Sequence, residues 1–406
     1  MKNFELLAPA GNFEKLKTAL YFGADAVYVG GKAFSLRALS NNFTNDELTE
    51  AVLYTHALGK KIYVAVNVLA RNADFEGIDE YLGFLHKIGV DAVIMSDPGA
   101  VRLCLEKHKG LIVHLSTQAS TLNKYSAKFW AVLGVKRIVL ARELSLKEVK
   151  EIVDFCGAEI EIFIHGAMCI SYSGRCLLSN YLSGRDGNRG ACVQCCRWEY
   201  EIREKNKGGE YLPVEQDERG TYIFNSKDLN LINYLSEVHD SGAVSLKIEG
   251  RMKSEYYLAT VINAYRRAID AFEKFGADYI KKFDFEEEVE KTAHRLFTTA
   301  YALGGNDKTV NYSDSQSRGS RTFIAVCIGG GSDDHGEYSL IEMRNRFAAG
   351  ETLEVLSPSD INNLTFDDFE MRDFLTDEPV FDAKLVQQKI KLYAPVKLSA
   401  GDMLRR

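Results

Sequence analysis

The sequence lacks the local patterns that identify several common classes of protein. Its 406 residues contain no run of eighteen apolar residues, so nothing in it predicts a membrane span. None of its eight histidines begins an H-E-x-x-H motif, and no G-x-S-x-G motif occurs, which argues against a zinc metalloprotease and a serine hydrolase. The net charge of −7 argues against a protein that coats nucleic acid, although a local basic patch could still contact phosphates.

The start of the chain also lacks a secretory pattern, because Met1-Lys-Asn-Phe-Glu leads directly into a strand pattern. We therefore expect a cytoplasmic protein without membrane association, whose thiols are reduced. Disulfides are then not the expected use of its eight cysteines. The apolar share of 46% and the charged share of 26% are typical of a globular protein large enough for a barrel and a small second domain.

The first 280 residues alternate strand and helix patterns. Eight segments have the apolar periodicity of strands: Glu5–Ala8, Ala26–Val29, Lys61–Asn67, Ala92–Ser96, Leu111–Thr117, Arg137–Ala141, Glu159–His165 and Val244–Glu249. The helical patterns between them include Asn12–Phe22, Asp46–Leu58, Ile78–Ile88, Ser145–Phe155 and Ser254–Phe275, with capping boxes at Thr44…Glu47 and Ser145…Glu148. Eight strand–helix units predict an α/β fold, a (β/α)8 TIM-like barrel, with an open doubly wound sheet as the alternative.

The seventh unit carries an insertion. About sixty residues separate its strand from a helix expected near Asp228, and they include the cysteines and a hairpin pattern at Tyr200–Glu204 and Tyr211–Glu215. After about residue 290, short alternating strands predict a small all-β domain, at Thr322–Ile328, Tyr338–Ile341, Thr352–Leu356 and Lys389–Val396, with a turn at Gly329–Gly336. The predicted domains are thus a barrel over residues 1–290, with a cysteine-rich loop over about residues 166–220, and a β-rich tail over residues 291–406.

Five of the eight cysteines lie in this insertion, with the spacing C-x6-C-x15-C-x2-C-C: Cys169, Cys176, Cys192, Cys195 and Cys196. Thiolates at the first three and at Cys196 could surround one metal centre, and Cys195 could replace Cys196. The spacing departs from zinc knuckles and suits an iron–sulfur cluster held by one long loop, although a zinc staple or free thiols stay open as alternatives. Cys104, Cys156 and Cys327 lie in apolar contexts and are predicted to be core residues.

Several predicted strands place polar side chains on the face that should line the barrel. Alternation puts Glu161 and His165 on that face of strand seven, and Lys247 and Glu249 on that face of strand eight. Asn67 and Gln118 follow at the ends of strands three and five. Because a lumen packed only for stability would be aliphatic, this pattern predicts a binding site at the upper end of the barrel. The alternative is a satisfied polar core, or strands that are displaced by one residue.

The cysteine segment and several others together resemble a known family. Glu161-x-Phe-x-x-Gly166-Ala-Met-Cys169-x4-Gly174-x-Cys176-x-Leu-Ser179 is similar to the signature of the collagenase-like peptidase family of unclassified mechanism. Further matching segments are Leu7-Ala-Pro-Ala-Gly-Asn, Gly23-Ala-Asp-Ala-Val-Tyr-Val-Gly-Gly, Asn188-Arg-Gly-Ala-Cys192, Ser226-Lys-Asp-Leu and Lys247-Ile-Glu-Gly-Arg-Met-Lys-Ser. The resemblance covers essentially the whole chain. Cys195 stands where proline is common, and Ala300 stands where glycine is usual.

This resemblance implies a 4Fe–4S cluster on Cys169, Cys176, Cys192 and Cys196, loaded by iron–sulfur assembly machinery. It also implies oxygen-independent hydroxylation. One branch of the family is implicated in the prephenate-dependent conversion of the wobble uridine of certain tRNAs to 5-hydroxyuridine, and other relatives act on ribosomal RNA or on a ubiquinone precursor. The expected partners are therefore tRNA and prephenate.

The two carboxylates of prephenate would need fixed cations, for which Arg142, Lys247, Arg251 and Arg37 are the candidates. The other expected substrate-binding residues are Glu249, Asn67 and Gln118. His165 and Glu161 are the candidate acid–base groups. Arg185 and Arg189, in the basic loop Gly184-Arg-Asp-Gly-Asn-Arg-Gly, are candidates for contacts with tRNA phosphates, or the loop is only a turn that lets the cysteines converge.

Two other classes of function compete with hydroxylation. A cysteine protease could pair Cys169 with His165, but that pair would leave four clustered thiols unexplained. A non-catalytic RNA-binding or assembly module could carry a purely structural cluster, but the polar lumen argues against it. The sequence therefore favours an RNA hydroxylase, with a peptidase, or a hydroxylase of ribosomal RNA or a quinone precursor, as the alternative.

Overall fold

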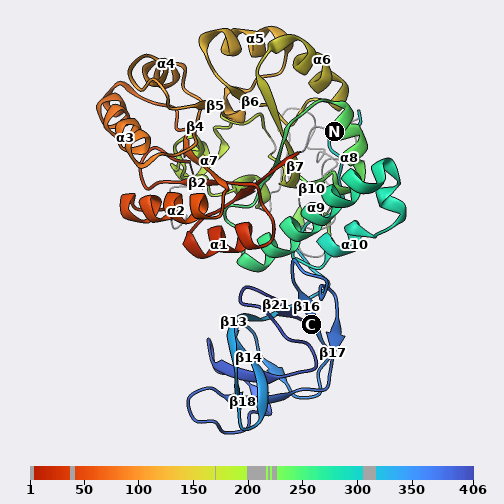
Figure 1. Cartoon of the computed structure of the whole chain (residues 1–406). Coiled ribbons are helices and arrows are strands. Elements are labelled where there is room, and N and C mark those ends of the chain that lie inside the picture. Colours follow the sequence, from red (N-terminus) through yellow and green to blue (C-terminus); the bar gives the residue numbers. More distant parts are fainter. Residues whose placement is uncertain are drawn as a thin grey trace.

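The computed structural model describes residues 4–36, 42–169, 171–198, 216–217, 220–221, 226–304 and 317–406. Eight parallel strands form a barrel (Figure 1): β1 (Glu5–Pro9), β2 (Ala26–Gly30), β3 (Lys61–Val66), β4 (Ala92–Met95), β5 (Val113–Leu115), β6 (Arg137–Val139), β7 (Glu159–Ala167) and β11 (Ser245–Ile248). The barrel is closed because β11 pairs with both β1 and β7. This closure excludes the open doubly wound sheet, and all eight predicted strands are confirmed.

The helices around the barrel include five at the ranges that the 3.6-residue periodicity predicts, namely Asn12–Phe22, Asp46–Leu58, Ile78–Ile88, Ser145–Phe155 and Ser254–Phe275. The helices around the barrel are α1 (Phe13–Tyr21), α2 (Asn45–Ala57), α3 (Phe75–Ile88), α4 (Pro98–Lys107), α5 (Lys124–Leu133), α6 (Leu146–Cys156), α8 (Leu235–Asp240), α9 (Glu255–Phe275) and α10 (Phe285–Glu290). Both predicted capping boxes are present, at Thr44 with Glu47 and at Ser145 with Glu148. No helix in the described part of the chain is long and apolar enough to cross a membrane.

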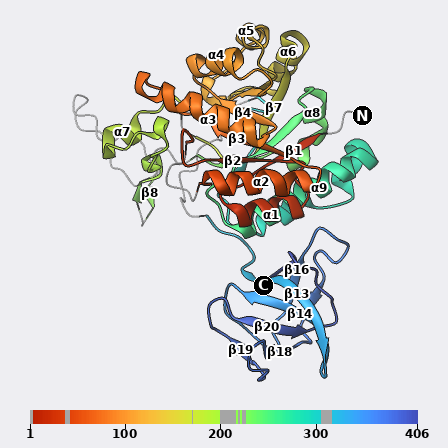
Figure 2. The ribbon, with the colours of Figure 1, turned by 60° about the vertical axis from the view of Figure 1, so that its left-hand side comes forward.

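The insertion after β7 projects from one side of the barrel (Figure 2). Its described elements are α7 (Leu178–Ser183), the short 3-10 helices η3 (Gly187–Arg189) and η4 (Cys195–Arg197), and the paired strands β8 (Gln216–Asp217) and β9 (Gly220–Thr221). The prediction of a helix starting near Asp228 is wrong, because β10 (Asp228–Asn230) begins there and pairs antiparallel with β7. The hairpin predicted across residues 200–215 lies outside the described residues.

The tail is the all-β domain that the sequence predicts. Its seven-stranded antiparallel sheet has the order β17-β16-β21-β13-β14-β20-β18, formed by β13 (Phe323–Asp333), β14 (Gly336–Met343), β16 (Leu353–Leu356), β17 (Thr365–Phe366), β18 (Glu370–Asp373), β20 (Lys389–Tyr393) and β21 (Met403–Arg405). The glycine-rich segment is largely strand rather than turn, because Gly329–Asp333 pair with β14 and the chain reverses only between Asp333 and Gly336.

A buried ion-pair cluster joins the tail to the barrel. Arg405 is fully buried and lies 2.7 Å from Glu354 of β16 and 2.8 Å from Glu288 of α10. The ammonium of Lys291, just after α10, is 2.7 Å from the same Glu354 carboxylate. Burial alone would raise the pKa of Glu354, but Arg405 and the hydrogen bonds from its neighbours outweigh burial and lower the pKa to about 2.

We predict that Glu354→Gln destabilises the protein by about 3 kcal/mol, because it leaves buried cations undercompensated. The expected result is a lower midpoint of thermal unfolding at neutral pH. The matched control is Glu351→Gln, which removes an exposed ion pair with Arg406 and should change stability by less than about 1 kcal/mol. Equal effects of the two substitutions would show that the buried cluster does not fasten the tail.

Candidate functional site

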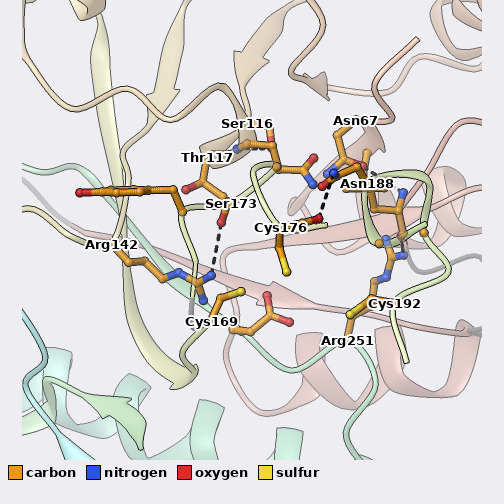
Figure 3. Close-up of a pocket in the computed structure, with 18 of the residues that line it drawn as sticks. Asn67, Ser116, Thr117, Arg142, Cys169, Ser173, Cys176, Asn188, Cys192 and Arg251 are labelled. Atoms are coloured by element: carbon orange, nitrogen blue, oxygen red, sulfur yellow. Dashed lines mark hydrogen bonds between the residues drawn. The ribbon is translucent and has the colours of Figure 1, made fainter. Parts of the chain in front are cut away.

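A cavity of about 230 Å³ lies at the carboxyl ends of the barrel strands, beneath the cysteine-rich insertion (Figure 3). Ten of the predicted site residues line it: Asn67, Gln118, Arg142, Lys247, Glu249, Arg251, Cys169, Cys176, Cys192 and Cys196. Four further predicted residues, Glu161, His165, Arg185 and Arg189, are not in its lining. The structure thus brings the predicted cations and thiols to one place, while their individual roles stay predictions.

The lower part of the barrel is filled by side chains. Glu161 is fully buried and accepts hydrogen bonds from Lys247 at 2.8 Å and from the Ser245 hydroxyl at 3.1 Å. Below it, Arg137 ion-pairs with both Glu161 and Glu5. Burial would raise the pKa of Glu5, but the Arg137 guanidinium outweighs burial and lowers it. The end of the barrel opposite the cavity is therefore closed by a paired, charged core.

This network changes the expected role of Glu161. Its carboxylate is occupied by cations and does not reach the cavity, so the geometry does not support direct proton transfer to a ligand. It instead fixes Lys247, whose ammonium lies 4.4 Å from the centre of the Tyr28 ring and 5.6 Å from that of Phe163. The ammonium of Lys247 is thereby held on the cavity floor by the Glu161 carboxylate and by two aromatic rings.

Two arginines extend the positive lining of the cavity. Arg142 donates a hydrogen bond to the Ala167 carbonyl at 2.8 Å and another to the Ser173 hydroxyl at 3.4 Å, as Figure 3 shows for Ser173. Arg251 donates to the Ser35 hydroxyl at 3.0 Å and to the Leu36 carbonyl. Each arginine therefore both faces the cavity and holds a loop at its rim. Arg37, the remaining predicted cation, lies outside the described residues.

Gly30 shows how closely Arg251 is packed. A Cβ atom at Gly30 would lie 2.4 Å from Nη1 of Arg251, closer than atoms can approach. The two uncharged amides of the predicted site also line the cavity, and Asn67 accepts a hydrogen bond from the Leu36 backbone N–H at 3.1 Å. Arg251 and Asn67 therefore position the same segment after β2.

All five cysteines of the insertion line the cavity. Cys195 is 2% exposed, and burial raises the pKa of its thiol, whereas the other four are at least partly exposed. In the described part of the chain, no three histidine, cysteine or acidic side chains form a group that could hold a single metal ion. In a 4Fe–4S cluster each thiolate binds a different iron, so thiols spread around one cavity fit a cluster better than a single zinc ion. Cys104, Cys156 and Cys327 are buried, as predicted.

His165 does not face the lumen, contrary to the predicted alternation. The pairing of β11 with β7 shifts after Lys247, so that Phe163 and His165 pair with the adjacent residues Lys247 and Ile248. This irregularity turns the imidazole away from the lumen, where it packs 5.4 Å from the ring of Tyr265 and 5.5 Å from that of Phe297. Burial lowers the pKa of His165 to about 4, so the ring is neutral at pH 7.

The two arginines predicted to contact RNA differ from each other. Arg185 is exposed. The guanidinium of Arg189 forms two hydrogen bonds with the Asp74 carboxylate, at 2.9 and 3.1 Å, and donates to the Leu69 carbonyl at 3.3 Å. Arg189 therefore makes a contact within the protein, while the prediction that it binds tRNA phosphates stays a prediction.

The sequence analysis missed several residues of the cavity, notably Tyr28, Tyr172, Ser173 and Asn188. The signal for Tyr28 was available, because alternation with Val27 and Val29 places it on the inner face of its strand. Asn188 belongs to the segment Asn188–Cys192, which the sequence indicates only through its resemblance to the family. Its side chain donates to the Cys176 carbonyl at 3.2 Å and so joins the two halves of the insertion (Figure 3).

The fold and the site define a TIM-like barrel protein with a thiol-lined cavity and an all-β tail. The chain belongs to peptidase family U32: residues 11–312 match that family and residues 320–405 match the family's C-terminal domain. It is 39% identical over 366 residues to tRNA hydroxylation protein P1 of Bacillus subtilis, covering 90% of this chain and 86% of that one.

Two further relatives differ in their names. The chain is 34% identical to a collagenase of Porphyromonas gingivalis, with 75% of this chain and 74% of that one covered. It is 33% identical to the 23S rRNA 5-hydroxycytidine C2501 synthase of Escherichia coli, with 80% of this chain and 48% of that one covered. The family therefore includes proteins named for RNA hydroxylation and for proteolysis.

We predict an acid-dependent loss of stability from His165. Because its pKa falls from 6.5 to about 4 on folding, the unfolded chain binds the proton first, so stability should fall between pH 6.5 and 4, by up to roughly 3 kcal/mol. Urea unfolding at pH 7 and pH 4.5 would measure this loss for wild type and His165→Gln. The variant should lose less than the wild type. Identical losses would show that His165 does not titrate in this way.

Proposed function

We propose that this chain is an iron–sulfur enzyme that hydroxylates tRNA, converting the wobble uridine to 5-hydroxyuridine with prephenate as the co-substrate. The observation that carries the proposal is the meeting of clustered thiols and three fixed cations in one cavity at the open end of the barrel. The names of relatives that cover most of this chain support RNA as the substrate class. The reaction would be independent of oxygen, as the family resemblance implies.

Cys169, Cys176, Cys192 and Cys196 would hold a 4Fe–4S cluster at the rim of the cavity, after loading by the iron–sulfur assembly machinery. Cys195 lines the same cavity and is the alternative fourth ligand. When bound, the cluster would supply redox chemistry beside the cavity. The residues of the chain itself would bind and orient the two substrates.

Lys247, Arg142 and Arg251 would bind the two carboxylates of prephenate. Lys247 offers a point charge on the floor, and each arginine offers a fork of N–H donors at the rim. Tyr28 and Phe163 provide flat apolar walls beside Lys247, which suits the ring of such a ligand. Glu249 also lines this cavity and could hydrogen-bond the hydroxyl of the ligand.

The RNA would approach the same open end of the barrel, with the target base turned out of its stack toward the cavity. The exposed Arg185, on the insertion beside the cysteines, stays a candidate for a phosphate contact. Arg189, whose guanidinium is paired with Asp74, would be less available for such a contact.

Proteolysis is supported by the collagenase relative but not by the site. A cysteine protease needs a histidine within reach of an exposed thiol. None of the residues described as lining the cavity is a histidine, and His165 lies behind β7, packed against Tyr265. The pair of Cys169 with His165 that the sequence allowed is therefore not formed.

We predict that cells lacking this chain lose 5-hydroxyuridine and its derivatives from total tRNA, provided that they carry no redundant enzyme. Nucleoside mass spectrometry would measure the loss, with complementation by the wild type and by Cys176→Ser. Only the wild type should restore the nucleoside, because the variant lacks one cluster ligand. Unchanged tRNA would contradict the proposal and direct attention to ribosomal RNA, a quinone precursor and then peptides.

We also predict that Arg142→Gln weakens the binding of prephenate by about tenfold to a hundredfold, because it removes a charge-assisted hydrogen bond of about 1.5–3 kcal/mol. Isothermal titration calorimetry would measure the affinity. Arg185→Gln, on the exposed part of the insertion, is the matched control and should bind like the wild type. Equal affinities for all three proteins would remove Arg142 from the proposed site.

A further inference from the structure

The first half of the insertion is fastened to the β5–β6 side of the cavity. The Ser120 hydroxyl donates to the Ser173 carbonyl at 3.0 Å, and Arg142 reaches Ser173 from after β6. Gly174 has a φ of +78°, and a Cβ there would lie 2.9 Å from the Gln118 carbonyl oxygen. The backbone at Ser173 and Gly174 therefore lies directly against the barrel loops.

The second half of the insertion is fastened to a different part of the barrel, the segment after β3, by Arg189. Its guanidinium meets both carboxylate oxygens of Asp74, in η1 (Asn72–Asp74), and also the Leu69 carbonyl. Asp74 is held ready for this contact, because it also accepts a hydrogen bond from the Arg71 backbone N–H at 2.7 Å. Arg189 is 115 residues from Asp74 in the chain and only three residues from Cys192.

Hydrogen bonds connect this anchor with the thiols. Asn188, next to Arg189, donates to the Cys176 carbonyl at 3.2 Å. The Ser179 hydroxyl accepts from the Val193 backbone N–H at 3.2 Å and donates to the Arg185 carbonyl at 2.7 Å. The position of the Cys192 segment relative to Cys176 thus depends on a short network of which the Arg189–Asp74 pair is the attachment to the barrel.

We propose that Arg189 and Asp74 are positioning residues for the metal centre: their bidentate ion pair fixes Cys192 and Cys196 across the cavity from Cys169 and Cys176. The metal part of this proposal rests on the proposed function, whereas the anchoring of the loop does not. A bidentate arginine–carboxylate contact suits the task, because it restricts orientation as well as distance. In this arrangement Arg189 contributes to RNA binding only through the shape of the loop.

The anchoring can be tested on the full chain without metal. Hydrogen–deuterium exchange of residues 187–196 should be about tenfold faster in Arg189→Ala and in Asp74→Asn than in the wild type, because each loses a charge-assisted contact. Arg185→Ala, an exposed arginine of the same loop, is the matched control and should exchange like the wild type. Wild-type exchange in Arg189→Ala would overturn the proposal.

The metal part can be tested on protein reconstituted with iron and sulfide. Arg189→Ala and Asp74→Asn should lose their visible absorbance to a chelator several-fold faster than the wild type and Arg185→Ala. The charge-reversed double variant, Asp74→Arg with Arg189→Asp, should recover much of the slow loss, which a merely structural disturbance would not do. Equal rates of loss in all variants would overturn the positioning role.

Two other outcomes distinguish the positioning role of Arg189 from the metal function and from direct contact with RNA. A wild type that takes up no iron would refute the proposed metal function, while the exchange measurement would still decide the anchoring. If Arg189 instead contacts RNA phosphates, Arg189→Ala would weaken tRNA binding and Asp74→Asn would not. The proposal requires that the two substitutions have the same effect on binding, exchange and cluster loss.

Discussion

The pairing of β11 with both β1 and β7 is the constraint on which the rest of the structure depends. It closes the sheet into a ring, so that loops from distant parts of the chain meet at one end. Arg251, just after β11, can therefore hold Leu36 after β2, and Arg142 after β6 can reach the insertion that follows β7. Without the pairing of β11 with β1, Arg251 after β11 and Leu36 after β2 would lie near opposite edges of an open sheet and could not meet at one cavity.

Much of the fold could be predicted because the sequence patterns that specify it involve residues close together in the chain. Apolar periodicity located all eight barrel strands, since strands buried between a lumen and a layer of helices carry a continuous apolar signal. Both capping boxes were also correct, because a capping box involves only residues three apart. Ala300 has a φ of +47°, in the left-handed region that favours glycine, which agrees with the resemblance that places glycine there. Closure was predicted from the count of eight strand–helix units and not from periodicity, because periodicity reports nothing about contacts between the first and last strands.

The sequence predicted which of several side chains would come to the cavity, but not which residues they would pair with. Strand alternation correctly brought Lys247 to the cavity, but it failed for His165, because the irregular pairing after Lys247 interrupts the two-residue period. The commitment of Arg189 to Asp74 was beyond local reasoning, since the two residues are 115 apart in the chain. Glu161 is fully buried and pairs with Lys247, so it serves to hold that lysine. The sequence alone could not distinguish such a carboxylate from an unpaired acid.

The charged core at the lower end of the barrel has a consequence for the order of events in the proposed reaction. Tyr63 and Arg137 are buried there with Glu161, so that, in the described part of the chain, side chains fill the barrel floor beneath the cavity. A small molecule and a large one that use the same opening cannot arrive in arbitrary order, because the large one covers the way in. The kinetics would then follow a compulsory sequence, with the small co-substrate first, and an excess of RNA would inhibit turnover by trapping the empty enzyme.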